Sequence, residues 1–140
     1  MIEIAEDQIL HLPDGMIGFP DEKRFVLLKH SEESPFLWFQ SVDNGHLAFV
    51  VTDPFWFQPD YDFEIDPQEA EVLELKGHPE EVQTLVVVNL HLSNGPPVIT
   101  ANLLGPIVIN LRKRLAKQLV LYRSAYSHRH PIPLQSNQKP

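Results

Sequence analysis

The chain has 140 residues, 43% of them hydrophobic, and a formal net charge of −8 at pH 7, which predicts one domain with an apolar core. It lacks cysteine, which excludes disulfides and thiolate chemistry. With no run of 18 apolar residues, the sequence predicts no membrane-spanning helix. The N-terminus is acidic, unlike a signal peptide, so we expect a cytoplasmic protein.

Short β-branched runs and 13 prolines predict a mostly β domain made of short strands. The first candidate strands are residues 9–12, which end at a Pro13-Asp14-Gly15 turn, and residues 24–30. We expect residues 1–132 to form a single β domain and residues 133–140 to form a flexible C-terminal tail.

A hairpin is predicted where two apolar runs, 36–42 and 47–53, flank Asp43-Asn44-Gly45-His46. The Asn-Gly pair favours a tight turn, because both residues tolerate the positive φ angles that such a turn needs. Both arms are apolar on both faces in places, which favours the interior of a closed or nearly closed sheet.

One short helix is predicted to follow Asp66. This residue can cap the helix, Pro67 fits the first helical position, and Glu69 lies three residues after the cap. Gly77 can end the helix in a left-handed conformation. The apolar side of the helix would consist of Ala70, Val72 and Leu73.

The second half of the chain predicts three more strands, at residues 84–92, 98–104 and 107–111. Turns are expected at 78–82 and 93–97. Proline cannot donate to a strand ladder, so Gly105-Pro106 predicts a bulge or a corner between the last two strands. These corners favour a small closed or folded-over antiparallel or mixed sheet of barrel-like shape.

Leucines at residues 111, 115 and 119 have helical spacing, so a helix over residues 111–121 is an alternative to strand, turn and strand.

The charge is divided unevenly along the chain. Residues 1–81 contain all 19 acidic residues and four of the 11 Lys and Arg, which gives this segment a net charge of −15. The charged residues in 82–140 are all basic. The two halves can pair across one fold and cancel locally. Alternatively, the protein presents an acidic face that attracts basic partners and repels nucleic acid.

Sequence signatures of catalysis are absent, including G-x-S-x-G, a Walker loop, H-E-x-x-H and G-x-G-x-x-G. His128 and His130 would share one face of a strand, but no third metal ligand is visible. Asp53 and Asp60 could pair as acid and base, yet each lies beside a proline and is expected to shape a turn. We expect neither a metal nor a cofactor.

Basic residues cluster at Arg112, Lys113, Arg114 and Lys117. We interpret this cluster as a solvated turn, because affinity for phosphates needs many cations with few nearby anions and the whole chain is acidic.

Residues 53–63 (DPFWFQPDYDF) concentrate five aromatic side chains among acids and prolines. Strand alternation would bury Phe55 and Phe57 while Trp56 points outward, or the reverse. Tyr61 lies between two aspartates, so we expect its phenol to be at least partly solvated. The segment is either core packing or an acid-rimmed aromatic contact patch of the kind that protein interfaces use. Its candidate contact residues are Asp53, Phe55, Trp56, Phe57, Asp60 and Tyr61.

Two further groups of residues are candidates for partner binding. Asn102 and Asn110 lie among Leu, Ile and Val, where a buried amide needs partners. We expect them to cross-link strands, with contact to a partner backbone as the alternative. Gln40, Asp43 and Asn44, at the hairpin tip, form the next candidate surface.

Two segments resemble the FliW family of bacterial flagellar assembly factors: residues 34–54 (SPFLWFQSVDNGHLAFVVTDP) and 100–110 (TANLLGPIVIN). The resemblance includes residues 24–28 (RFVLL) and 126–131 (YSHRHP) and covers residues 2 to 132.

This resemblance implies a small β-barrel-like module that is not an enzyme and is a monomer when free. Its implied partners are flagellin before secretion and the RNA-binding translational regulator CsrA. Binding CsrA would relieve repression of flagellin translation, without direct binding to nucleic acid or membrane.

The chain departs from the family pattern in three places. It starts close to residues 2–4, so the first strand is expected to be short or its edge open. Gly105 stands where Ala is usual, and residues 121–124 (LYRS) replace a usually acidic stretch. The alternative function is a barrel-like small-molecule-binding domain or hydrolase that uses Asp53, Asp60 or a histidine. An enclosed cavity with converging polar groups would favour that alternative, and an open acidic and aromatic surface would favour the protein binder.

Overall fold

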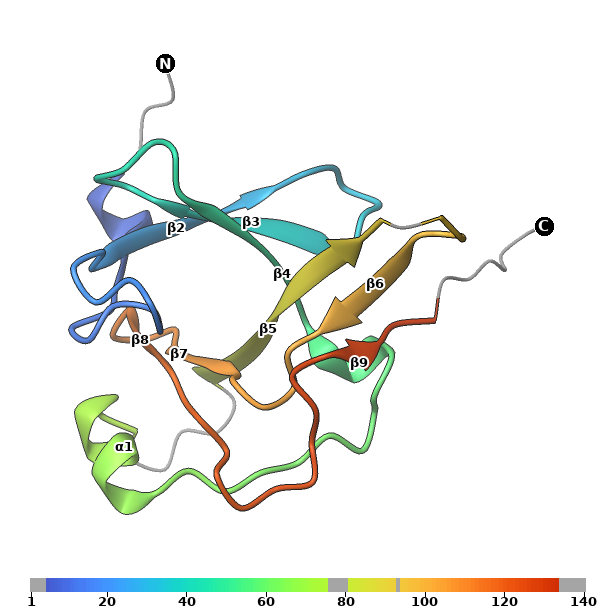
Figure 1. Cartoon of the computed structure of the whole chain (residues 1–140). Helices are drawn as coiled ribbons and strands as arrows, with labels where there is room; N and C mark the ends of the chain where they lie inside the picture. The colour runs from blue at the N-terminus through green and yellow to red at the C-terminus, as the bar shows by residue number, and fades with distance from the viewer. Residues whose placement is uncertain (1–4, 76–80, 93, 134–140) are drawn as a thin grey trace.

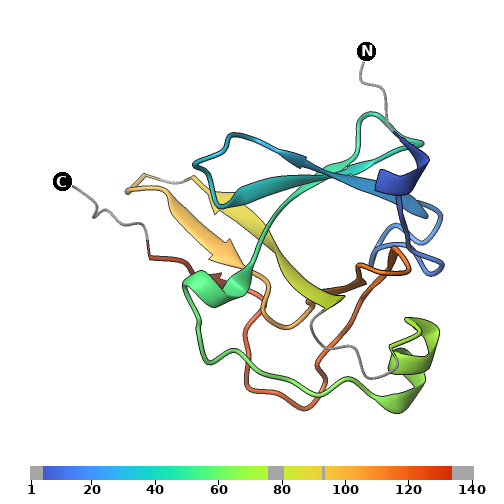
Figure 2. The same cartoon turned by 180° about the vertical axis from the view of Figure 1, so that it is seen from behind.

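A closed ring of seven strands forms the body of the protein (Figure 1; Figure 2 shows it from behind). The computed structural model describes residues 5–75, 81–92 and 94–133. The ring runs β4-β3-β2-β1-β8-β7-β5, and β5 pairs back with β4. Its pairings are antiparallel except between β1 and β8. The predicted mostly β, barrel-like fold with one short α-helix is confirmed for the described residues.

The elements follow the predicted order closely. The strands are β1 (Leu10–His11), β2 (Arg24–Lys29), β3 (Phe36–Ser41), β4 (Ala48–Thr52), β5 (Val82–His91), β6 (Val98–Ala101), β7 (Ile107–Asn110), β8 (Leu115–Gln118) and β9 (His130–Pro131). The helices are α1 (Pro67–Val72) and the 3-10 turns η1 (Glu6–Gln8) and η2 (Pro54–Trp56). Residues 111–121 form a turn and β8, so the strand, turn and strand prediction is confirmed over the helical alternative.

Strand β5 joins the ring to a small extension of the sheet. Its residues 82–85 pair with β7, residues 86 and 87 with β4, and residues 88–91 with β6. Because β6 and β7 lie along the same edge of β5, residues 102–106 bulge out between them, which confirms the predicted break. Strand β9 pairs with the outer edge of β6.

The bulge at residues 102–106 is tightly packed. A Cβ on Gly105 would lie 3.1 Å from Asn102 Nδ2 and 3.2 Å from Gln118 Nε2. Gln118 Nε2 also donates a hydrogen bond to the Gly105 carbonyl at 3.0 Å. Glycine therefore lets β8 approach the bulge closely.

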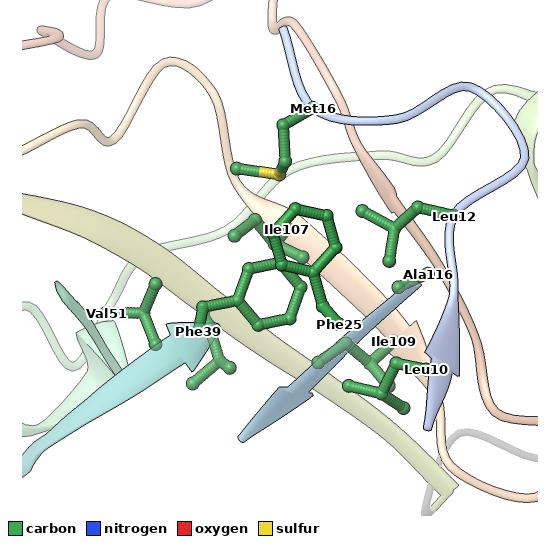
Figure 3. Close-up of a cluster of buried hydrophobic side chains, with 10 residues drawn as sticks. Leu10, Leu12, Met16, Phe25, Phe39, Val51, Ile107, Ile109 and Ala116 are labelled. Atoms are coloured by element: carbon green, nitrogen blue, oxygen red, sulfur yellow. The ribbon is translucent and has the colours of Figure 1, made fainter. Parts of the chain in front are cut away.

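Apolar side chains fill the inside of the ring (Figure 3). Phe25 and Phe39 stack there with ring centroids 4.5 Å apart. Along β5 the side chains alternate, so that Leu85 belongs to this inner cluster whereas Val86 and Val88 face outward. A second cluster therefore lies outside the ring: Tyr61, Val86, Val88, Ala101, Leu103, Leu121 and Ile132.

The hairpin between β3 and β4 differs from the tight Asn-Gly turn that we predicted. The last pair of the ladder is Gln40 and Ala48, and neither Asn44 nor Gly45 has a positive φ. Side chains shape the loop instead, because Ser41 Oγ accepts the Asn44 N–H at 3.0 Å and Asn44 Oδ1 accepts the His46 N–H at 3.0 Å. A longer loop with such bonds does not need the left-handed backbone.

Helix α1 begins as predicted but ends earlier. Pro67 is its first residue, yet the Asp66 side chain makes no capping hydrogen bond. Glu74 adopts the left-handed conformation (φ 57°) that we expected of Gly77. The Leu75 N–H then donates to the Ala70 carbonyl at 2.9 Å, which completes a Schellman end.

Several predictions concern residues outside the described ranges. The expected strand at residues 2–4 and the helix end at Gly77 lie there entirely. The turns at 78–82 and 93–97 and the tail at 133–140 lie there in part. In the described parts of the chain, no helix is both long and apolar enough to cross a bilayer.

Candidate partner-binding surface

The aromatic segment at residues 53–63 starts with a single 3-10 turn, η2. Asp53 Oδ1 caps it by accepting the Phe55 N–H at 2.8 Å. The tight turn replaces strand alternation, so Phe55 and Trp56 are both exposed, at 42% and 44%, while Phe57 is half-buried. Both predicted alternation patterns are therefore wrong, because they assumed an extended backbone.

Trp56 is exposed but held in one orientation. Its indole Nε1 donates to Thr52 Oγ1 at 2.8 Å, and that hydroxyl donates to the Pro35 carbonyl at 2.7 Å. The ring also meets Phe36 and Phe57 edge-on, with centroids at 6.1 and 5.2 Å. A fixed aromatic side chain loses little entropy when it is buried by a partner, which suits a contact residue.

Tyr61 is a core residue, which corrects the expectation of a solvated phenol. It is 4% exposed, and its hydroxyl donates to the Leu103 carbonyl at 2.6 Å. Its ring packs on Tyr126, whose hydroxyl accepts the Asp62 N–H at 2.9 Å. Burial, with a smaller contribution from Tyr126, raises the pKa of Tyr61 well above its usual value. Tyr61 therefore anchors the segment to the outer core.

An open groove of about 760 Å³ lies between this segment and the first half of β5. Its floor is apolar and two acids line it. The lining residues are Asp53, Phe55, Tyr61, Asp62, Phe63, Ile65, Leu75, Val82, Gln83 and Thr84. Only three of them belonged to the predicted site. The local sequence pattern could not predict that residues 62–65, Leu75 and residues 82–84 come together here.

Asp53 and Asp60 do not converge on the groove as an acid and base pair would. Asp53 lines it but caps η2, whereas Asp60 lies outside its lining and accepts a hydrogen bond from Gln58 Nε2 at 2.8 Å. Asp53 shapes a turn, as expected, and Asp60 lies within one. The open groove with its aromatic and acidic lining is the kind of surface that we associated with a protein binder.

A second groove of about 660 Å³ adjoins the first through Asp62 and Phe63. Its other walls come from Glu64, Asp66 and residues 120–124. Residues 121–124 are the stretch where the resemblance implied acidic residues. Arg123 lines the groove, and the neighbouring Tyr122 is 87% exposed.

Asn102 and Asn110 both have structural hydrogen bonds. Asn102 Oδ1 accepts the N–H groups of Leu104 and Gly105, each at 3.0 Å, and so shapes the bulge. Asn110 is 2% exposed. Its Nδ2 donates to the Leu73 and Glu74 carbonyls, and its Oδ1 accepts from two N–H groups in the next turn. Asn110 thus fastens the end of α1 to β7.

The hairpin-tip candidates lie at the other end of β4 from the aromatic segment. Gln40 Nε2 donates to three carbonyls across the loop, at 3.0 to 3.3 Å. Asp43 accepts two hydrogen bonds from the Arg24 guanidinium, at 2.6 and 3.1 Å, and these lower the pKa of Asp43. The two candidate surfaces therefore do not merge into one site.

The basic cluster is largely paired with acids from the first half of the chain. Arg112 contacts Glu81 at 2.7 Å, and Lys113 contacts Glu74 at 3.4 Å. Lys117 contacts Glu69 at 2.6 Å and Asp14 at 3.2 Å, and these carboxylates raise its pKa. The solvated-turn interpretation is consistent with this pairing.

The charge therefore cancels around the turn between β7 and β8. Asp53, Asp60 and Asp62 make no ion pair within the described part of the chain, so no cation described there offsets their charge. In the same part of the chain, no group of three His, Asp or Glu residues is placed to hold a metal ion.

A small barrel with an open groove and exposed, fixed aromatics beside acids is typical of a protein-binding module. The family model described as "FliW protein" matches residues 1–132. Named relatives, each called "Flagellar assembly factor FliW", cover 94% of this chain. One from Syntrophus aciditrophicus (strain SB) is 44% identical over 82% of its own length, and one from Bacillus subtilis (strain 168) is 41% identical over 90%.

A solved structure, "Crystal structure of the flagellar assembly factor FliW", matches with a TM-score of 0.83 and 39% identity, over 93% of this chain and 89% of that one. The chain belongs to the FliW family of flagellar assembly factors, and the resemblance seen in the sequence is confirmed. The relatives are named as assembly factors and not as enzymes.

Proposed function

We propose that this chain is a cytoplasmic, non-enzymatic protein that binds flagellin and, when flagellin is absent, binds CsrA and so relieves its repression of flagellin translation. Family membership supports this role. The observation that carries it is the surface at residues 53–63, where Phe55 and Trp56 are exposed beside acids without ion-pair partners among the described residues.

The chemistry of this surface suits a basic protein partner. Exposed aromatic side chains supply most of the binding energy in many interfaces, and unpaired acids around them speed encounter with a partner of opposite charge. A regulator that binds RNA presents such a basic face. The same acids repel RNA, so the protein acts on the regulator and binds no nucleic acid itself. No membrane is involved, and the free protein is a monomer.

The switch between the two partners is a coupling of two binding equilibria. If flagellin weakens the binding of CsrA by some factor, CsrA must weaken the binding of flagellin by the same factor. This reciprocity holds whether the two partners share one surface or use separate surfaces.

The test is a titration of this protein into a complex of CsrA with a labelled flagellin leader RNA, followed by fluorescence anisotropy. We expect the RNA to be released, the effect to weaken as salt screens the charges, and added flagellin to reverse it. Binding of the RNA by this protein alone, or no release, would overturn the proposal. A ternary complex of all three proteins with unchanged affinities would overturn the switch.

A pair of charge reversals locates the surface. Asp60→Lys places a cation on the aromatic segment, whereas Glu71→Lys makes the same change on the exposed side of α1. We expect the first to weaken CsrA binding by about tenfold or more and the second to have little effect. Equal effects of the two changes would show that only net charge matters.

A further inference from the structure

The first half of β5 has an edge without a strand partner among the described residues. Strand β4 pairs with β5 only at residues 86 and 87. Strand β4 ends at Thr52. The chain then forms η2 and runs below the sheet towards α1 (Figure 1). Residues 82–84 of β5 pair with β7 on their other side only.

The hydrogen-bond pattern shows which backbone groups lie on this open edge. The Leu111 N–H donates to the Glu81 carbonyl at 2.8 Å, so in the antiparallel ladder with β7 the odd residues of β5 make the bonds to β7. The Asn102 N–H donates to the carbonyl of Val87, which is another odd-numbered residue of β5, so the odd residues face the same edge there. The N–H and C=O groups of Val82 and Thr84 therefore point away from β7, towards the groove.

The groove beside this edge combines apolar and acidic groups. Phe55, Phe63, Ile65 and Leu75 provide apolar side chains, while Asp53 and Asp62 provide charge. No Lys, Arg or His lines the groove in the described part of the chain. An exposed strand edge beside apolar pockets is what proteins that bind peptides by strand addition offer.

We propose that this groove binds an extended, basic segment of a partner protein by adding a strand to the open edge of β5. Backbone groups of the segment bond to Val82 and Thr84. Alternate side chains contact the apolar floor, and the others place their cations near Asp53 and Asp62. The inference rests on the proposed function only in treating this side of the molecule as a binding surface, since no known partner sequence enters it.

An added strand fits this groove better than a helix does. A helix satisfies its own backbone groups and would leave those of Val82 and Thr84 without partners. A strand satisfies them, and its side chains alternate with a period of two, so that one face meets the apolar floor and the other stays with the acids and solvent.

The experiment uses three synthetic hexapeptides and the ¹⁵N-labelled full chain in NMR titrations. The first peptide alternates lysine and valine. The second has the same sequence with N-methyl groups on alternate residues, which removes the N–H donors of one edge. The third alternates glutamate and valine.

We expect the lysine peptide to shift the amide signals of Val82 and Thr84 most, in a saturable way. The N-methylated and the glutamate peptides should bind at least about tenfold more weakly, because they lose the backbone bonds and the charge match respectively. Equal binding of all three peptides, no saturable shift with any of them, or shifts centred on another part of the sheet would overturn the proposal.

Two matched variants test the side-chain part of the groove. Phe55 and Phe19 are almost equally exposed, yet only Phe55 lines the groove. Phe55→Ala should weaken binding of the lysine peptide about tenfold, whereas Phe19→Ala should change it less than twofold. The reverse order, or equal losses in variants that remain folded, would place the peptide elsewhere.

The same measurements separate this inference from the proposed function. Peptide binding at Val82 and Thr84 in a protein that fails to release RNA from CsrA would support the inference and overturn the function. Release of RNA by a protein that ignores all three peptides would support the function and overturn the inference.

Discussion

Replacing Tyr61 and replacing Trp56 should have opposite consequences, although the two residues lie five positions apart in one aromatic segment. Tyr61 is 4% exposed and Trp56 is 44% exposed. We expect Tyr61→Ala to destabilise the fold and Trp56→Ala to weaken partner binding in a protein that remains folded.

The expected cost of Tyr61→Ala follows from its contacts. The ring packs against Tyr126 at 4.7 Å and Phe63 at 5.4 Å, and loss of such a buried aromatic ring costs about 3–5 kcal/mol. Tyr61→Phe keeps the ring and removes only the 2.6 Å hydrogen bond to the buried Leu103 carbonyl. An unsatisfied buried acceptor of this kind costs about 1–3 kcal/mol.

Trp56→Ala removes a half-exposed ring and one hydrogen bond to Thr52, so its cost to folding should stay near 1 kcal/mol. In a domain whose total stability is about 5–15 kcal/mol, only Tyr61→Ala should come close to unfolding the protein. We expect its melting temperature to fall by about 10 °C or more.

Urea and thermal unfolding followed by circular dichroism, with CsrA binding measured on the same preparations, would check both variants. The Trp56 variant should lose about 2 kcal/mol or more of binding free energy, as contact residues at the centre of interfaces do. A Tyr61→Ala protein that unfolds like the parent would refute the placement of Tyr61 in the core. A Trp56→Ala protein that melts as early as Tyr61→Ala would refute its role as a surface contact.

Four further changes test other parts of the structure. Burial raises the pKa of Tyr61. The stability that the neutral Tyr61 side chain contributes is therefore full below the ordinary tyrosine pKa of about 10 and decreases as pH rises above that value. In urea unfolding at alkaline pH, the free energy of unfolding should fall less with pH for Tyr61→Phe than for the parent protein. Asn110→Ala leaves two carbonyls and two N–H groups without their hydrogen bonds to this side chain. The free energy of unfolding in urea should fall by about 2–4 kcal/mol. A loss of less than about 1 kcal/mol would contradict the role of Asn110 in fastening α1 to β7. Glu74→Gly relieves a positive φ and should raise stability by about 1 kcal/mol in the same assay, and a lower stability would show that its contact with the basic turn matters more. The hydrogen bonds from the Arg24 guanidinium lower the pKa of Asp43, so an NMR titration should give a midpoint below the ordinary aspartate value, and Arg24→Gln should raise that midpoint. The small stabilisation from this pair is present above the ordinary aspartate pKa and disappears as pH falls through the lowered one.

The resemblance to the FliW family also sets apart two features of this chain. At Gly105, where the resemblance implied Ala, a Cβ would press on Asn102 and Gln118. Residues 121–124, where the resemblance implied acids, line a groove opposite acids of residues 62–66. Arg123 therefore brings a cation to a groove whose other charged residues are acidic.

Local sequence determined most of the strands of this protein. Apolar, β-branched runs predict strands wherever they occur, because a pleated backbone places alternate side chains on a buried face. The break at Gly105-Pro106 was also local, since proline has no N–H to donate to the ladder. Asp53 shapes a turn for a similar reason: its carboxylate reaches an N–H only two residues away.

The exposure of the aromatic segment was decided by tertiary structure. Tyr61 is buried because Leu103 and Tyr126, far away in the chain, close over it, and no pattern within residues 53–63 records their approach. Helix α1 reaches its left-handed end at Glu74, directly after Leu73, which packs in a core with Val108 and Leu119. The groove likewise exists only because β4 leaves β5 after two paired residues. Sequence periodicity encodes which faces of a strand are apolar, but which surface covers each face depends on contacts between distant segments, and these exist only in the folded protein.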